Sequence, residues 1–283
     1  MRILVIAASG FLGERVFKEL VRRGHTVSGP SLAGNTFGRF DITDRESCQM
    51  SLEGGHFDSV VNLAGSGVTA GSASEGEMRR VNYGGAIALG EAIAATKKPP
   101  WLVHASSGTE PREAHTPESA YSASKAEGTR ALGALLESAR IPFSVARIHN
   151  TYGPSQPSGR FVMRVIKSLL AGEEVHVKYP SRVRDFCYVE DVVCHLADMA
   201  EITYSSSSVS EIGTGKGTSL WNLVEIVRRR LGSSTNVMMT PITWASDLNE
   251  YQVGNSGDPG FLLCETSLED GIDKVLRSLR CDG

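Results

Sequence analysis

The stretch ILVIAASGFLGERV, residues 3–16, decides the fold of this chain. It opens with an apolar run of strand length and continues, from about Phe11, with apolar residues at helical spacing. Gly10 and Gly13 fall in the turn between the two, and Ala7 stands where a first glycine is usual. Such a turn brings backbone close to a pyrophosphate, whose charge faces the helix N-terminus. The stretch predicts a dinucleotide-binding turn; the alternative is a helix packed closely on its strand through small residues.

The rhythm of strand and helix continues outward from this turn. Apolar runs at residues 59–64 and 141–148 alternate with stretches of helical period, as in the βαβ units of a parallel sheet. Beyond Asn150 comes the loop NTYGPSQPSG, after which the expected elements are shorter and less regular. We therefore expect an α/β fold with a doubly wound parallel sheet over residues 1–150. A smaller substrate-binding lobe is expected over residues 151–283, with some of its segments returning to the sheet.

The composition narrows the class of protein. Hydrophobic residues make up 41% and charged residues 22%, and the net charge is −3, which fits a soluble enzyme of small ligands and gives no basic footprint for nucleic acid. The run ILVIAA is too short to span a bilayer and leads into glycines, so we expect a cytoplasmic protein that does not bind membranes. The 5 cysteines show no C-x-x-C spacing, so neither a metal site nor a disulfide framework is expected.

The end of the second expected strand bears on the choice of dinucleotide. For NAD this strand ends in a carboxylate that binds the ribose 2′-hydroxyl. Here HTVSGPS, residues 25–31, ends in glycine, proline and Ser31, and the nearest cation is Arg39. Without that carboxylate a 2′-phosphate meets no repulsion, so NADP(H) is favoured, while NAD(H) stays open.

Asp41, in GRFDITDRES, has two readings. Its carboxylate could receive the adenine amino group of the cofactor. Alternatively it belongs to the start of the next helix, where Thr43 and Glu46 have the spacing of a capping box.

The stretch ESAYSASKAEG, residues 118–128, places Tyr121 and Lys125 one helical turn apart. Positions i and i+4 lie on one helix face, so the lysine can sit under the tyrosine. A phenol has a pKa near ~10, and a neighbouring ammonium favours the phenolate. Tyr121 could then donate a proton to a ketone oxygen, although the spacing alone is weak evidence.

The strand before this helix strengthens the hypothesis. VHASSGTE ends a strand in Ser106 and Ser107, at the edge where a parallel sheet presents its ligands. A serine hydroxyl there would donate a hydrogen bond to the same carbonyl oxygen. The alternative for adjacent serines at a strand end is turn formation.

These motifs resemble the extended short-chain dehydrogenases/reductases, the sugar-nucleotide epimerase, dehydratase and reductase group. ASGFLG is similar to the glycine turn of that family. The family's other motifs follow in its order and over nearly the whole chain: VVNLAG, VNYGGAIALGEA, ASS, YSASK, ARIHNTYGPSQ, RDFCYVEDV and EIGTGKGTSL. The resemblance implies a Rossmann-type domain with a substrate lobe, and a homodimer.

The resemblance also implies roles for single residues. In that family the tyrosine is the acid–base, the lysine holds the nicotinamide ribose and lowers the tyrosine pKa, and a serine or threonine orients the substrate carbonyl. Those roles fall on Tyr121, Lys125 and Ser107, with Ser106 as the close alternative. The implied cofactor-binding residues are Ala7, Gly10, Phe11, Leu12, Gly13, Ser31, Asp41, Ile42, Leu63, Ala64, Tyr121 and Lys125.

Two further residues are implied in substrate binding. The family's loop asparagine and the arginine of its R-D-F motif touch the nucleotide diphosphate, which corresponds to Asn150 and Arg184 here. Arginine suits this task because its planar fork pairs with phosphate oxygens. The alternative for Arg184 is a salt bridge with Asp185 or Asp191.

The expected activity is NADPH-dependent reduction of a nucleotide-activated keto sugar, in particular a 4-keto-6-deoxyhexose. Dehydratases of the group carry Asp-Glu after the active-site threonine, where this chain has Gly108 and Thr109, so dehydration is set aside. The alternatives are an NAD-dependent nucleotide-sugar 4-epimerase and a family member that binds NADP without turnover.

Overall fold

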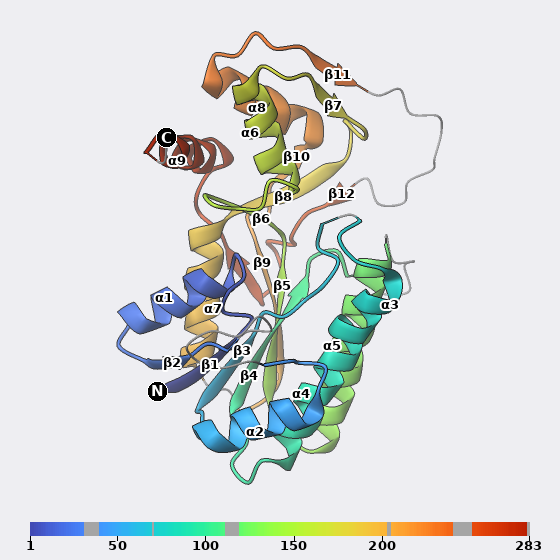
Figure 1. The fold of residues 1–283 in the computed structure, drawn as a ribbon, viewed down its shortest axis with the longest axis vertical. Helices are drawn as coiled ribbons and strands as arrows, with labels where there is room; N and C mark the ends of the chain where they lie inside the picture. Colours follow the sequence, from blue (N-terminus) through green and yellow to red (C-terminus); the bar gives the residue numbers. More distant parts are fainter. Residues whose placement is uncertain (31–39, 70, 111–118, 203–204, 240–250, 282–283) are drawn as a thin grey trace. The chain divides into compact units, whose positions relative to one another are not determined.

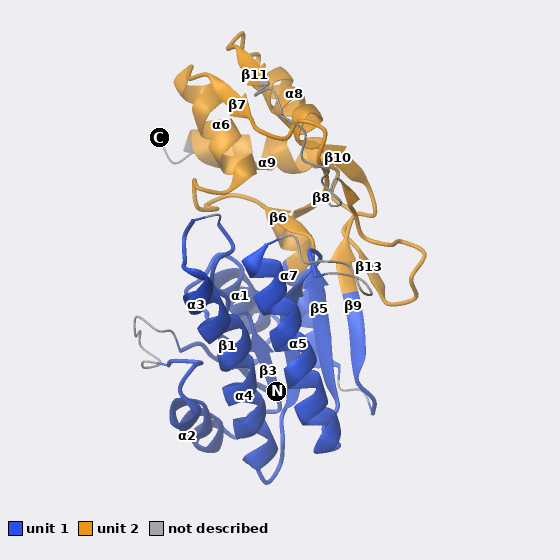
Figure 2. Cartoon of the chain, turned by 90° about the vertical axis from the view of Figure 1, so that its right-hand side faces the viewer, with its two compact units in different colours: residues 1–148, 193–210 blue, residues 149–192, 211–283 orange. Residues whose placement is uncertain are grey.

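The computed structural model describes residues 1–30, 40–69, 71–110, 119–202, 205–239 and 251–281. The chain forms two compact units, coloured separately in Figure 2. The first comprises Met1–Ile148 and Val193–Ser210, and the second comprises His149–Val192 and Glu211–Gly283. The first continuous stretch of the first unit thus ends close to residue 150, and the unit also includes the later segment Val193–Ser210.

A seven-stranded sheet has the order β13-β9-β5-β4-β3-β1-β2 (Figure 1). Its pairs β1 with β2, β1 with β3, β3 with β4, β4 with β5 and β9 with β13 are all parallel. The predicted parallel, Rossmann-type sheet is therefore confirmed. The strands are β1 (Arg2–Ile6), β2 (Thr26–Ser28), β3 (Ser59–Asn62), β4 (Trp101–Ser107), β5 (Phe143–Ile148), β9 (Ser208–Gly213) and β13 (Phe261–Leu263).

Helices cover both faces of the sheet in the first unit. In Figure 1, α1 and α7 lie on one side and α2, α4 and α5 on the other. The main apolar cluster is formed between the second set and the buried faces of β1, β3, β4 and β5. The helices are α1 (Gly13–Arg22), α2 (Arg45–Gly55), α3 (Glu75–Met78), the π-helix η1 (Arg79–Gly84), α4 (Gly85–Ala95), α5 (Ala120–Ser138) and α7 (Val189–Glu201).

Local sequence signals explain how several helices begin and end. Val16 and Leu20 form the buried stripe of α1, and Gly24 follows that helix with a φ of +89°. A later helix, residues 220–231, is capped at its start by Ser219, which accepts from the Asn222 N–H at 3.1 Å, and ends at Gly232, with a φ of +62°.

The predicted capping box at α2 is wrong. The N-cap is Asp44, whose carboxylate accepts from the Glu46 N–H at 3.2 Å and the Ser47 N–H at 3.3 Å. Thr43 instead donates its backbone N–H and its hydroxyl to Asp41. The helix therefore starts one residue later than the spacing of Thr43 and Glu46 suggested.

The second unit is built on smaller sheets. Strand β8 pairs with β10, β12 and β6, and β7 pairs with β11. The buried carboxylate of Asp185, on β8, accepts hydrogen bonds from the backbone of Thr214, Gly215 and Gly254, which fixes the loops around it. The elements are β6 (Asn150–Tyr152), β7 (Val175–Val177), β8 (Val183–Tyr188), β10 (Gly217–Ser219), β11 (Val237–Met239), β12 (Tyr251–Gln252), α6 (Phe161–Ala171), α8 (Leu220–Leu231) and α9 (Leu268–Cys281).

The described residues contain neither a membrane-spanning helix nor a metal-binding cluster. No helix among them is long and apolar enough to cross a bilayer. Within the same ranges, no cluster of histidine, cysteine, aspartate and glutamate side chains could hold a metal ion.

Candidate active site

The turn between β1 and α1 has the geometry that its sequence predicts. Ala7 adopts a φ of +62°, and its carbonyl accepts from the Gly10 N–H at 2.9 Å. A Cβ atom on Gly13 would lie 2.0 Å from the Ala7 carbonyl oxygen, so only glycine allows α1 to pack this closely on the turn. Leu12, at the helix start, offers no side-chain cap, and the Glu14 N–H donates to the Gly10 carbonyl at 3.0 Å.

Strand order places this turn at the switch point of the sheet. The chain leaves β1 for β2 on one side, whereas β3 lies on the other side of β1. Ligands bind at such switch points, outside the carboxyl ends of the strands. Leu63 and Ala64 follow β3 at the same edge, where the Leu63 N–H donates to the Ile6 carbonyl at 3.3 Å. The candidate cofactor residues after β1 and after β3 are therefore brought together.

The expected adenine end of the site is held by a chain of hydrogen bonds. The Thr43 hydroxyl donates to Asp41 Oδ1 at 2.8 Å and accepts from Arg80 at 2.7 Å. Ile42 is buried against the start of α4, where a Cβ on Gly85 would come within 2.9 Å of it. Ser31 and Arg39 lie outside the described residues.

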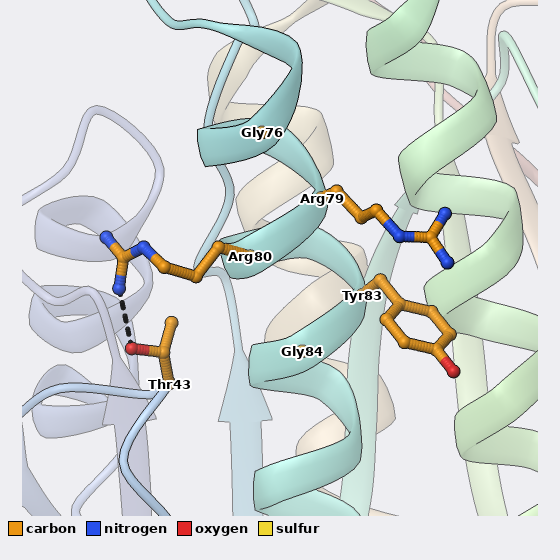
Figure 3. Close-up of a pocket in the computed structure, with 6 residues that line it drawn as sticks. All are labelled: Thr43, Gly76, Arg79, Arg80, Tyr83 and Gly84. Carbon is orange, nitrogen blue, oxygen red and sulfur yellow. Dashed lines mark hydrogen bonds between the residues drawn. The ribbon is translucent and has the colours of Figure 1, made fainter.

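An open hollow of about 450 Å³ lies next to the hydrogen bonds that join Asp41, Thr43 and Arg80 (Figure 3). Arg80 extends to one side toward Thr43, while Arg79 and Tyr83 extend to the other. The Arg79 guanidinium stacks over the Tyr83 ring at 4.9 Å and pairs with Glu127. The hollow is lined by Thr43, Gly76, Arg79, Arg80, Tyr83 and Gly84.

Lys125 is the buried cation of the site. It lies on α5, is only 4% exposed, and donates from Nζ to the carbonyl of Ala105 on β4 at 2.7 Å. Burial lowers its pKa to about 8, against the opposing effect of the Glu110 carboxylate. Tyr121 lies one turn earlier on the same helix and is half-buried.

The two candidate serines have different partners. Ser107 Oγ lies 2.8 Å from Thr109 Oγ1, which also accepts from Ser122 at 2.9 Å, so this hydroxyl is linked to the turn of α5 that carries Tyr121. Ser106 is hydrogen-bonded to Glu110 and lies 2.8 Å from the Thr129 hydroxyl. Ser106 is therefore engaged by the buried Glu110 carboxylate, whereas Ser107 is linked to the Thr109 hydroxyl.

Asn82 has a role in the site that the sequence did not reveal. It is buried in η1, exchanges two hydrogen bonds of 2.9 Å with the backbone of Ser66, and donates to Ser124 Oγ at 2.9 Å. Ser124 in turn donates to the Tyr121 carbonyl at 2.9 Å. Asn82 thus ties the loop after β3 to the first turn of α5. Its motif, VNYGG, was the available signal, but no function for the side chain follows from the motif alone.

Asn150 and Arg184 lie in the second unit. Asn150 is half-buried on β6, opposite Phe186 in the strand register. Arg184 is 9% exposed on β8 and donates to the Val183 carbonyl at 2.9 Å. Of the two aspartates named as alternative partners of Arg184, Asp185 accepts from the amides described above and Asp191 accepts from the N–H and hydroxyl of Thr266.

The fold is shared with several solved nucleotide-sugar enzymes. The structure matches UDP-glucose 4-epimerase from Thermotoga maritima, solved with UDP-glucose, with a TM-score of 0.84 and 23% identity over 100% of this chain and 99% of the other. It matches the Thermus thermophilus UDP-glucose 4-epimerase, solved with NAD, with a TM-score of 0.81 and 23% identity over 99% of both chains. At these identities the likeness concerns the fold.

The sequence itself identifies the family. Residues 3–208 match the NAD dependent epimerase/dehydratase family, and the chain belongs to it. It is therefore an NAD(P)-dependent enzyme of the extended short-chain dehydrogenase/reductase type. A relative, the dTDP-6-deoxy-L-talose 4-dehydrogenase (NAD(P)(+)) of Kitasatospora kifunensis, is 27% identical over 266 residues, covering 85% of this chain and 82% of the relative. A dTDP-glucose 4,6-dehydratase of Neisseria gonorrhoeae is 28% identical over 228 residues, 67% of this chain and 66% of the relative.

Proposed function

We propose that this protein is an NADPH-dependent reductase of a nucleotide-activated keto sugar, with 4-keto-6-deoxyhexoses as the substrate class. The cofactor delivers a hydride to the keto carbon, and Tyr121 donates the proton to the oxygen. Lys125 holds the nicotinamide ribose and favours the tyrosinate, while Ser107 orients the carbonyl. Asn150 and Arg184 are assigned to the diphosphate of the substrate.

The observation that carries the proposal is the buried ammonium of Lys125. Lys125 is 4% exposed, and its Nζ donates to the Ala105 carbonyl. Burying a charged group costs free energy, so a lysine kept at this position is expected to have a function. Its lowered pKa of about 8 lies near the operating range of acid–base catalysis, and it stands one helical turn from Tyr121. This pairing suits proton donation to a carbonyl oxygen.

The relatives support the substrate class. The Kitasatospora relative is named a 4-dehydrogenase of a 6-deoxy sugar nucleotide, and the reverse of such an oxidation is reduction of a 4-keto-6-deoxy sugar. A dehydratase reaction is not favoured, because Gly108 and Thr109 replace the acidic pair. The next residue, Glu110, is held by Ser106 and Thr129 instead.

The preference for NADPH rests on the second strand. Residues 29–31 supply no carboxylate to repel a 2′-phosphate. The Kitasatospora relative is named for both NAD and NADP, so use of NADH is the alternative outcome.

An NAD-dependent 4-epimerase is the second candidate. The Thermotoga and Thermus epimerases share the whole fold. An epimerase retains its cofactor through oxidation and re-reduction, so the purified protein would contain NAD.

A substrate panel tests the proposal. Purified protein is mixed with NADPH or NADH and nucleotide 4-keto-6-deoxy sugars, and loss of reduced-nicotinamide absorbance is followed. We expect oxidation that depends on one sugar and is faster with NADPH. Bound NAD with no oxidation on any sugar would favour the epimerase, and cofactor binding without turnover of any kind would favour the non-catalytic member.

Tyr121→Phe tests the proton donor. Loss of a positioned acid should lower kcat by ~10²–10⁴-fold while NADPH still binds. Tyr83→Phe is the matched control, because this tyrosine lines the hollow beside η1 and stacks on Arg79. Full activity in Tyr121→Phe, or equal losses in the two variants, would remove Tyr121 from the mechanism.

A further inference from the structure

Glu110 is a buried acid next to the candidate site that none of the roles above uses. It follows β4, three residues after Ser107, and its side chain is 3% exposed. Burying a carboxylate is unfavourable unless it is paired and hydrogen-bonded. The groups that surround it therefore indicate what it does.

Its contacts join three elements of the first unit. One oxygen, Oε1, accepts from the Ser106 hydroxyl on β4 and from the Thr129 hydroxyl on α5, the latter at 2.7 Å. The other, Oε2, accepts from Arg147 Nε on β5 at 3.3 Å. The Ser106 and Thr129 hydroxyls also lie 2.8 Å apart. The carboxylate is thus a fixed junction between two neighbouring strands and the helix over them.

The same helix and strand carry the catalytic candidates. Thr129 lies one turn beyond Lys125 on α5, so both point to the same face of that helix. Lys125 reaches the carbonyl of Ala105, and Ser106, the next residue on β4, reaches Glu110. Two adjacent residues of β4 therefore anchor two adjacent turns of α5, one through Lys125 and one through Glu110.

We propose that Glu110 is a positioning residue of this active site. It locks α5 onto the end of β4, which keeps Tyr121 and Lys125 in register with Ser107, and it supplies the negative charge that keeps Lys125 an ammonium. The inference rests on the roles assigned to Lys125 and Tyr121 in the proposed function. It does not depend on which sugar is reduced.

The charge balance gives the direction of the expected effect. Burial lowers the pKa of Lys125 to about 8, and Glu110 opposes this. Other charged or titratable groups on the elements around Lys125 include Tyr121, one turn earlier on α5, Arg147 on β5, which pairs with Glu110, and His104 on β4. Burial and the charge of Lys125 hold the pKa of His104 well below its usual range, so it is neutral. Removing the Glu110 charge therefore lowers the pKa of Lys125, and the ammonium is lost at a lower pH.

The experiment measures cofactor affinity against pH without any sugar. Dissociation constants of NADPH and NADH are determined by nicotinamide fluorescence between about pH 6 and pH 10 for wild type, Glu110→Gln and Thr129→Val. In Glu110→Gln we expect the alkaline loss of affinity to move down by about one pH unit, the lower end of what a neighbouring charge produces. Thr129→Val removes a hydrogen bond to Glu110 but keeps the Glu110 charge. Its alkaline limb, the loss of cofactor affinity at high pH, should therefore fall at the same pH as that of wild type.

Several outcomes would overturn the proposal. One is an alkaline limb of Glu110→Gln that coincides with wild type, and another is an equal shift in Thr129→Val. If Glu110→Gln does not fold, Glu110→Asp decides: it keeps the charge with a shorter reach, so affinity should fall at every pH while the limb stays in place. Unchanged affinity would contradict the positioning role.

These outcomes separate the inference from the proposed function. Cofactor binding that responds to Glu110 as described, with no turnover in the sugar panel, would overturn only the reductase activity. Turnover in the sugar panel, together with an alkaline loss of affinity that does not move in Glu110→Gln, would overturn only the inference. Failure of wild type to bind either cofactor would overturn both.

Discussion

Ala7 adopts a φ of +62°, a conformation that costs a residue with a Cβ about 1–2 kcal/mol relative to a right-handed one. The family's usual first glycine avoids this cost, which explains why the position favours glycine without requiring it. Gly13 is different, since a Cβ there would lie 2.0 Å from backbone. The two positions of the turn therefore differ in how strictly they exclude a side chain.

Replacing Ala7 by glycine should stabilise the protein. Relief of about 1–2 kcal/mol of strain is partly offset by the ~0.4–1 kcal/mol by which glycine's freedom stabilises the unfolded chain, so a gain of up to about 1.5 kcal/mol in the free energy of unfolding is expected. Urea-induced unfolding measures it. Ala8→Gly is the matched control and should destabilise, because Ala8 has no positive φ to relieve. A loss of stability in Ala7→Gly equal to that in Ala8→Gly would contradict the strain argument.

At the scale of elements, α2 is the helix whose start the sequence misplaced. The spacing of Thr43 and Glu46 fitted a capping box, but Asp44 takes the extended conformation of the N-cap, with a φ of −103°. Thr43 is occupied by Asp41 and by Arg80, a residue far along the chain. Thr43 and Asp44 are adjacent, and either side chain could cap a helix. Asp44 caps α2, whereas the Thr43 hydroxyl is bonded to Asp41 and to Arg80.

The cap makes a direct prediction for α2. Asp44→Ala should lower the free energy of unfolding by about 1 kcal/mol, because two amides of the first turn lose their acceptor. Glu46→Ala is the control, since it removes the side-chain acceptor that a capping box would use and otherwise loses only a small interaction with the helix dipole. Thermal unfolding compares both variants, and a loss in Glu46→Ala as large as that in Asp44→Ala would restore the capping box.

At the scale of the whole molecule, the first unit is completed by a segment from late in the chain. The end of α7 returns to it, where the Trp101 indole N–H donates to the Met199 carbonyl at 3.0 Å. Arg23, after α1, binds Glu19, Asp198 at 2.6 Å and Glu201 at 2.8 Å. The first unit therefore cannot be regarded as one continuous stretch of sequence.

Arg23→Met tests how much the ion pairs between Arg23 and α7 stabilise the fold. It removes hydrogen bonds to charged groups from a side chain that is 19% exposed, so a loss of about 1–3 kcal/mol in the free energy of unfolding is expected. Arg22→Met, which removes only the exposed pair with Glu19, should change little. Unfolding at neutral pH measures both, and equal effects would mean that the contact between α1 and α7 adds nothing.

The same contact should weaken in acid. The hydrogen bond with His25 and those from Arg23 hold the pKa of Glu201 below its ordinary value of 4.5. A carboxylate with a lowered pKa contributes its full stabilisation above the unfolded pKa and loses it as the pH falls through the folded value. The difference between wild type and Arg23→Met should therefore shrink below about pH 4.

The sequence by itself was sufficient for the parallel sheet, for the family and for placing Tyr121 and Lys125 one turn apart on one helix. These features depend on neighbours along the chain: apolar runs of strand length, small residues in a turn, and two side chains one helical turn apart. The pattern at the end of β4 also offered two serines as candidates for a substrate-facing hydroxyl. It could go no further, because both have the same chemistry.

Only the tertiary structure decided which serine is engaged elsewhere, and only it revealed Asn82 and Glu110. Ser106 and Glu110 acquire their partners from Thr129 on α5 and Arg147 on β5, and Asn82 joins the loop after β3 to α5. The reason is physical: a hydrogen bond between residues tens of positions apart forms only where strands and helices pack, and no local pattern specifies which polar side chains then come within reach.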